Sequence, residues 1–132
     1  MTRARLRTEQ LIEIAGMGPY SELFLDELQK KVEPIEFANA RALFDSRLYV
    51  VQAGPHVKVG YTSKPKLRIS ELKHGNPLVA GYYFLSEPSF WATDMEREVH
   101  RELDEYWVRG EWYLCGPDIA VETIRRVFAV DR

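Results

Sequence analysis

Five side chains in the middle of the 132-residue sequence have the types needed for chemistry at a phosphate group. They are Tyr49, Lys58, Arg68, Glu96 and His100. A guanidinium presents a planar fork of donors that suits phosphate and stays charged at any working pH. A hard divalent ion such as Mg²⁺ needs only one or two protein carboxylates and takes its other ligands from water and phosphate. These residue types are therefore compatible with a metal-assisted phosphate site.

The charge distribution favours the same kind of site. Residues 41–74 contain seven lysines and arginines against two acidic residues, whereas acidic residues dominate after Glu87. The formal net charge of the chain is only −2, so the molecule as a whole does not attract nucleic acid strongly. Surface charge can also segregate in this way by chance, and Lys64 and Lys66 read as solvated charges that at most steer a polyanion.

The first of these side chains belong to a predicted β-hairpin. Residues 48–53 and 56–61 are β-branched and aromatic runs on either side of Gly54-Pro55. A turn at residues 53–56 would pair Tyr49 with Gly60, and would place both with Lys58 on the face opposite a valine core. A glycine inside a strand marks either the close approach of a ligand or a bulge beside a normally packed tyrosine, and both interpretations remain open.

Two predicted helices carry the remaining side chains. The first, residues 64–74 with Ser63 as its N-cap, carries Arg68, for which a surface ion pair with Glu71 is the structural alternative. The second, about residues 88–107, carries Glu96 and His100 one turn apart at the edge of an apolar stripe. One histidine beside one glutamate is too little for a zinc site, which needs three or four ligands.

The rest of the pattern predicts an α+β fold, with a small three-stranded antiparallel sheet flanked by helices. Residues 8–45 indicate two or three short helices, 78–85 a third strand and 118–128 a closing helix. We expect a helical N-terminal extension over 1–46 and one domain over 47–132. No apolar run approaches the ~20 residues of a membrane span. The single cysteine, Cys115, suits a reducing cytoplasm, where we expect the protein to reside.

The order of these features resembles the GIY-YIG nuclease superfamily, and most closely its phage- and bacterium-associated branch. Arg47-Leu48-Tyr49 stands at the GIY position and Lys58-Val59-Gly60 at the YIG position, followed by Tyr61-Thr62. Arg68 and Glu96 stand where the family has its helix arginine and its metal-binding glutamate, and His100 follows as in that branch. Residues 110–113, Gly-Glu-Trp-Tyr, resemble the closing GEWF-like element. The resemblance covers roughly residues 47–115.

The resemblance implies an endonuclease that uses Mg²⁺ or Mn²⁺ to hydrolyse phosphodiester bonds, with DNA as the expected substrate. Tyr49, Arg68 and Glu96 would then be catalytic, with Glu96 as the metal ligand and Lys58 and His100 as helpers. The residues expected to contact the substrate are Gly60, Tyr61, Lys73 and Asn76. The alternative is a nucleic-acid-binding module that kept this fold and lost catalysis.

One departure from the family pattern leaves the general base open. Lys58 replaces the second signature tyrosine, and Tyr61, three residues later, should face away from Tyr49 by strand alternation. A free tyrosine, with a pKa of ~10, is a poor base at neutral pH. We expect a nearby Lys58 ammonium or a metal ion to lower the pKa of Tyr49.

Overall fold

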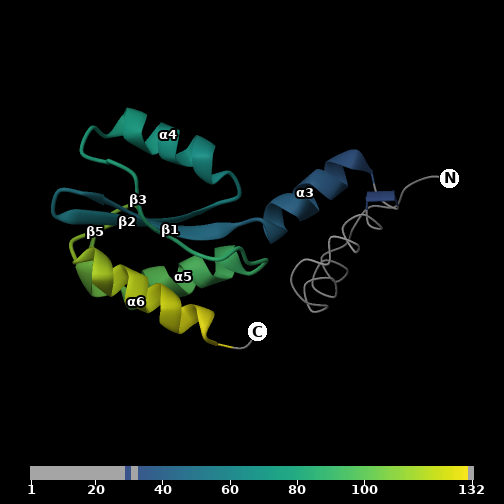
Figure 1. The fold of residues 1–132 in the computed structure, drawn as a ribbon. Coiled ribbons are helices and arrows are strands. Elements are labelled where there is room, and N and C mark those ends of the chain that lie inside the picture. The colour runs from purple at the N-terminus through teal and green to yellow at the C-terminus, as the bar shows by residue number, and fades with distance from the viewer. Residues whose placement is uncertain (1–28, 31–32, 131–132) are drawn as a thin grey trace.

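The protein folds around one antiparallel sheet that is covered by helices on both faces (Figure 1). The structure is a computed structural model that describes residues 29–30 and 33–130. Helix α4 lies on one face of the sheet, and α5 and α6 lie on the other. Helix α3 precedes the first strand and lies beyond its end (Figure 1). This arrangement confirms the predicted α+β class.

The elements follow one another along the chain without large insertions. In order they are α3 (Pro34–Phe44), β1 (Arg47–Ala53), β2 (His56–Thr62), α4 (Pro65–Gly75), β3 (Tyr82–Leu85), α5 (Ala92–Glu102), a short 3₁₀ helix (Asp104–Tyr106), β4 (Trp107–Arg109), β5 (Trp112–Tyr113) and α6 (Pro117–Phe128). The strand order across the sheet is β3-β1-β2-β5-β4, and every neighbouring pair is antiparallel. The long central strands β1 and β2 thus form the middle of the sheet.

The β1–β2 hairpin has the register that the sequence predicts. Tyr49 pairs with Gly60, and Val51 pairs with Lys58. Gly54 adopts a φ of 60° in the connecting turn, a conformation that glycine reaches at little cost. Because side chains alternate along a strand, this register separates two buried clusters on the two faces of the sheet.

The two clusters hold the helices to the sheet. Val50, Val57 and Val59 pack with α5 and α6 in the larger cluster. Tyr49 and Val51 belong to the smaller cluster, which packs against α4. The amphipathic helices α5 and α6 therefore cover the valine face, as the alternation predicts, while Tyr49 lies on the α4 face.

Several predicted boundaries were wrong. The sheet has five strands rather than three, because residues 107–109 and 112–113 form a second hairpin around Gly110, whose φ is 57°. The helix expected over 88–107 is shorter, since residues 104–106 tighten into a 3₁₀ turn after α5. The third strand begins only at Tyr82, after the turn and bend that follow α4.

The start of α4 also differs from the prediction. Ser63 is not its N-cap, because the helix begins one residue later and Lys64 occupies that position. The hydroxyl of Thr62 instead accepts a hydrogen bond from the backbone N–H of Lys64 at 3.0 Å. Tyr82 of β3 donates its hydroxyl proton to the carbonyl oxygen of Pro65 at 2.7 Å. That contact ties the first turn of α4 to the sheet.

Two further expectations concern the whole chain. Within the described ranges, no helix has the length and apolar character needed to cross a membrane. The helices expected before residue 29 lie outside the described residues, and the division at residue 46 stays a prediction.

Candidate metal centre and phosphate site

The candidate site forms where the edge of β2 is left open. Strand β5 pairs only with Val57 and Lys58 of β2. The backbone N–H and C=O groups that follow on this edge of β2 therefore need hydrogen-bond partners outside β5. The N–H of Val59 donates to the carbonyl oxygen of Glu111 at 3.2 Å. The carbonyl oxygen of Val59 lies 2.8 Å from Nε2 of His100. One backbone unit therefore positions two candidate functional residues.

The contact with Val59 fixes the orientation of the His100 ring. A carbonyl oxygen only accepts hydrogen bonds, so Nε2 must carry a proton. In the neutral imidazole, Nδ1 then keeps its lone pair. Nδ1 lies 3.9 Å from Oε1 of Glu96, one helical turn earlier on α5. Nδ1 of His100 thus lies on the side of the carboxylate, and the two residues share one side of α5, as their spacing predicts.

Glu96 is a buried carboxylate with unused bonding capacity. Its exposed fraction is 8%, and its Oε2 has no hydrogen-bond partner among the described residues. Burial, followed by the charge of Glu111, raises the pKa of Glu96 to about 7 from its ordinary value of 4.5. The backbone N–H of Tyr61 and the charges of Arg97 and Lys58 oppose this shift. Burying a carboxylate without hydrogen-bond partners costs free energy of folding unless the carboxylate binds a cation or a proton.

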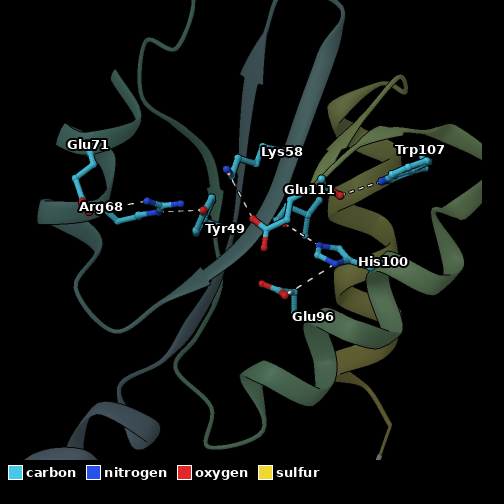
Figure 2. A network of polar contacts seen from close by, with 10 residues as sticks. Tyr49, Lys58, Arg68, Glu71, Glu96, His100, Trp107 and Glu111 are labelled. Atoms are coloured by element: carbon cyan, nitrogen blue, oxygen red, sulfur yellow. Dashed lines mark hydrogen bonds and ion pairs between the residues drawn. The ribbon is translucent and has the colours of Figure 1, made fainter. Parts of the chain in front are cut away.

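Glu111 completes a group of three candidate ligands. One donor atom each from Glu96, His100 and Glu111 lies within 4.8 Å of the others. The three residues come from α5 and from the β4–β5 hairpin, and Figure 2 shows their side chains gathered beside β2. Carboxylate and imidazole donors suit Mg²⁺, Mn²⁺ and other divalent ions. The donor set and the unpartnered Oε2 fit a divalent cation at this position.

On the α4 face, Tyr49 and Arg68 form a second unit. Nε of Arg68 donates to the Tyr49 hydroxyl at 3.3 Å, and Nη1 of Arg68 lies 4.0 Å from Oε1 of Glu71. The ion pair that the sequence offered as an alternative is therefore present together with a contact to the site. Tyr49 is only 1% exposed, and burial raises its pKa, although the Arg68 guanidinium opposes the shift. The hydrogen bond to Tyr49 in turn raises the pKa of Arg68.

Gly60 allows the Tyr49 ring to occupy its position. A Cβ added at Gly60 would lie 2.5 Å from Cζ of Tyr49 and closer still to the hydroxyl oxygen. Gly60 pairs in regular register with Tyr49, so it does not mark a bulge. The space that the glycine leaves is filled by the phenol itself. Neither interpretation offered by the sequence holds as stated, because the group that approaches Gly60 is the packed ring of Tyr49 and the strand has no bulge there.

Lys58 contacts Glu111 and Trp112. Its Nζ lies 3.8 Å from Oε2 of Glu111 and 5.6 Å from the centroid of the Trp112 ring. The expectation that Lys58 lowers the pKa of Tyr49 was wrong, because burial dominates and the pKa is raised. Arg68, rather than Lys58, is the cation that stabilises the phenolate form of Tyr49. Lys58 instead balances the charge of Glu111.

The structure brings together Tyr49, Lys58, Arg68, Glu96 and His100, as Figure 2 shows. The electrostatic influence of Glu96 and Glu111 on Tyr49 agrees with this proximity. Tyr61 pairs with Leu48, so its side chain lies on the face opposite Tyr49, as alternation predicts. Lys73 is exposed in the last turn of α4, and Asn76 follows that helix. Neither joins the cluster around Glu96.

Sequence reasoning missed Glu111 as a candidate ligand. The pattern Trp-Val-Arg-Gly-Glu-Trp-Tyr contains two short β-prone runs around a glycine, which is a hairpin signal. Recognition of that hairpin would have placed Glu111 in the turn, next to Gly110. Its distance from Glu96 and His100 still depends on how the hairpin docks against β2, which no local pattern encodes.

Comparison with known proteins gives one family match. The model of the T5orf172 domain matches residues 46–128, a stretch that includes every residue of the site just described. No curated protein and no solved structure matches the chain. The matched stretch is more than half of the chain and contains the whole sheet, α4, α5 and α6. The chain therefore belongs to the T5orf172 domain family, a phage-associated and nuclease-related family.

Proposed function

We propose that this protein is a GIY-YIG-type endonuclease that uses Mg²⁺ or Mn²⁺ to hydrolyse phosphodiester bonds in DNA. The observation that carries the proposal is the placement of the Glu96–His100–Glu111 group beside the hydrogen-bonded pair of Tyr49 and Arg68 (Figure 2). Phosphodiester hydrolysis places negative charge on the non-bridging and leaving oxygens. A cation site and a guanidinium that both lie near Tyr49 suit that charge distribution.

The candidate ligands have distinct roles in this proposal. Glu96 and His100, both on α5, would hold the metal, with Glu111 as a third ligand from the β4–β5 hairpin. A divalent ion bound there would stabilise phosphate charge as a Lewis acid. Lys58 keeps Glu111 near the site by balancing its charge. The backbone of Val59 orients the His100 ring and holds the backbone of Glu111 before the substrate arrives.

Tyr49 and Arg68 act on the water and the phosphate. Burial keeps the phenol of Tyr49 neutral at physiological pH, since it raises the pKa. The hydroxyl oxygen accepts from Arg68, so its own proton is available to orient the attacking water. The Arg68 guanidinium retains further N–H donors for the non-bridging oxygens of the phosphate. Tyr49 thus orients the nucleophile and does not need to ionise.

The experiment that tests this function measures both cleavage and binding. Supercoiled plasmid and single-stranded DNA are incubated with the protein in Mg²⁺ or Mn²⁺, and parallel samples contain EDTA. Arg68→Gln tests the phosphate contact, and Arg101→Gln removes an exposed arginine of α5 as the matched control. We expect cleavage by the wild type and by Arg101→Gln, loss of cleavage in EDTA, and a roughly 100-fold slower rate for Arg68→Gln.

The main alternative is a nucleic-acid-binding module of the same fold without catalytic activity. It predicts no cleavage by any form, together with DNA binding that weakens with a log–log salt slope of about 0.9 per phosphate neutralised. Thermal melting of each variant separates a loss of folding from a loss of chemistry. Cleavage that survives EDTA would reject the metal-dependent mechanism while leaving a nuclease in place.

A further inference from the structure

A groove next to the candidate site has the composition of a nucleobase site. It has a volume of about 380 Å³ and lies between the end of α4, the β1–β2 turn and the β4–β5 hairpin. Its lining includes Leu78, Val108 and Trp112 as apolar groups, and His56, Asn76 and Arg109 as polar ones. We propose that this groove binds an unpaired nucleobase of the DNA strand that crosses the phosphate site. The proposal deepens the proposed function and rests on it.

The chemistry of the lining supports this ligand. Trp112 offers an aromatic surface, and stacking on an aromatic side chain is the usual way in which proteins hold unpaired bases. The residues that line the groove include no carboxylate, whereas Arg109 supplies a positive charge. An anionic strand is therefore compatible with the groove, and a cationic ligand is not favoured. Leu78, which is 65% exposed, and Val108, which is 44% exposed, add apolar surface beside the ring.

Trp112 connects the groove to the candidate phosphate site through Lys58. Trp112 pairs with Lys58 across β5 and β2, and Nζ of Lys58 lies 5.6 Å from the centroid of the indole ring. The same Nζ lies 3.8 Å from Oε2 of Glu111. One lysine side chain thus separates the base groove from the candidate metal ligands. A strand whose phosphate lies at Arg68 and Lys58 could place a neighbouring base against Trp112.

A second groove on the other side of Leu78 serves as a comparison. It has a volume of about 480 Å³ and is lined mainly by Gln52, Tyr82 and Tyr83 with small residues. Its lining contains no charged side chain, and the hydroxyls of Tyr82 and Tyr83 already donate to Pro65 and Asp118. The charged groove at Trp112 is the one that suits a nucleic acid.

The proposed base site also gives a role to Asn76. Its Oδ1 accepts from the backbone N–H of Leu78 at 3.0 Å, which fixes the turn after α4. The Nδ2 amide group is not used in that bond and can donate to a base edge. Asn76 is one of the residues expected from the sequence to contact the substrate, and the groove is where that contact would occur.

The test measures the binding of single strands with and without bases. A short fluorescein-labelled oligothymidylate and the same strand with abasic internal positions are titrated in EDTA, where no cleavage occurs, and affinity is read by fluorescence anisotropy. Trp112→Leu removes the aromatic surface and keeps an apolar side chain, while Trp112→Phe keeps a ring. Arg101→Gln on α5 is the control. Thermal melting confirms that each variant is folded.

We expect the wild type to bind the base-bearing strand about tenfold more tightly than the abasic strand. This ratio should approach one in Trp112→Leu, persist in large part in Trp112→Phe, and remain unchanged in Arg101→Gln. Any of three results would overturn the proposal. The wild type could bind the two strands equally, it could bind neither strand, or the affinity ratio could persist in Trp112→Leu. Because the assay needs no metal, a failed base site and a failed nuclease activity are seen separately.

Discussion

His100 donates a hydrogen bond from Nε2 to the backbone oxygen of Val59, and the two atoms are 2.8 Å apart. The bond sets the orientation of the ring, so that Nδ1 lies on the side of Glu96. Metal-binding histidines commonly use one ring nitrogen in this way, which fixes the tautomer of the other. The open edge of β2 therefore supplies the orienting group for a candidate ligand on a different element.

Replacement of His100 by phenylalanine should weaken metal binding. The change keeps a ring that can pack near Tyr113, whose ring centroid lies 5.5 Å from that of His100, but removes both nitrogens. We expect the affinity for Mn²⁺, measured by titration calorimetry, to fall by about 10- to 100-fold. His74→Phe, at the exposed end of α4, is the control. If both variants bind Mn²⁺ as the wild type does, His100 is not a ligand.

The raised pKa of Glu96 predicts a pH-dependent stability of the metal-free protein. The native state holds the Glu96 proton up to about pH 7, whereas the unfolded state releases it near 4.5. The native state therefore binds more protons in this window, and stability is lost as pH rises through it. Glu96→Gln lacks this effect. In EDTA, the free energy of unfolding of the wild type should fall relative to that of the variant by up to about 3 kcal/mol between pH 4.5 and 8.

The measurement is chemical denaturation of both proteins across that pH range. Glu122→Gln, an exposed position of α6, provides a matched carboxylate-to-amide control. Its stability should run parallel to that of the wild type at every pH. Parallel curves for the wild type and Glu96→Gln would show that burial does not hold the Glu96 proton.

An alanine at position 60 should destabilise the fold by displacing Tyr49. The new Cβ would lie 2.5 Å from Cζ of Tyr49, and the ring is enclosed. Overpacking of this kind typically costs about 1–3 kcal/mol. Gly81→Ala is the control, since a Cβ there would meet nothing within 4 Å. Denaturant unfolding should show the loss for Gly60→Ala alone, and equal stability of the two variants would contradict the packing described.

Removal of the Tyr49 hydroxyl should slow cleavage without weakening metal binding. Tyr49→Phe keeps the ring over Gly60 but abolishes the hydrogen bond from Arg68 and the O–H that orients water. A loss of roughly 100-fold in the cleavage rate is expected. Tyr83→Phe removes the hydroxyl of an exposed tyrosine on β3 and should cut at the normal rate. An unchanged rate in Tyr49→Phe would exclude the phenol from the chemistry.

The β1–β2 hairpin could be predicted from the sequence because its turn and strand signals are local. Gly54-Pro55 sets the turn, and the alternation of valines with Tyr49 and Lys58 then fixes both the register and the two faces. The pairing of Glu96 with His100 followed from helical spacing, which depends only on four residues of separation. Such features need no knowledge of the tertiary structure.

The missed features depend on contacts between distant elements. Tyr106 continues the apolar spacing of the predicted helix, yet residues 104–106 form a 3₁₀ turn and residues 107–109 pair with residues 112–113 to extend the sheet. Glu111 becomes a candidate ligand only because this hairpin docks against Val59. Likewise, the pKa of Tyr49 is set by burial under α4 rather than by the nearest lysine in the sequence pattern. Tertiary packing determines each of these outcomes.

The most direct test of the proposed nuclease is the initial rate of plasmid nicking as a function of Mn²⁺ concentration. It compares the wild type, Glu96→Gln and Glu122→Gln, each shown to be folded by thermal melting. The wild type and Glu122→Gln should nick with the same saturable dependence on Mn²⁺, and Glu96→Gln should be at least about 100-fold slower. A Glu96→Gln variant that nicks as fast as the wild type at every Mn²⁺ concentration would contradict the assignment of the metal centre.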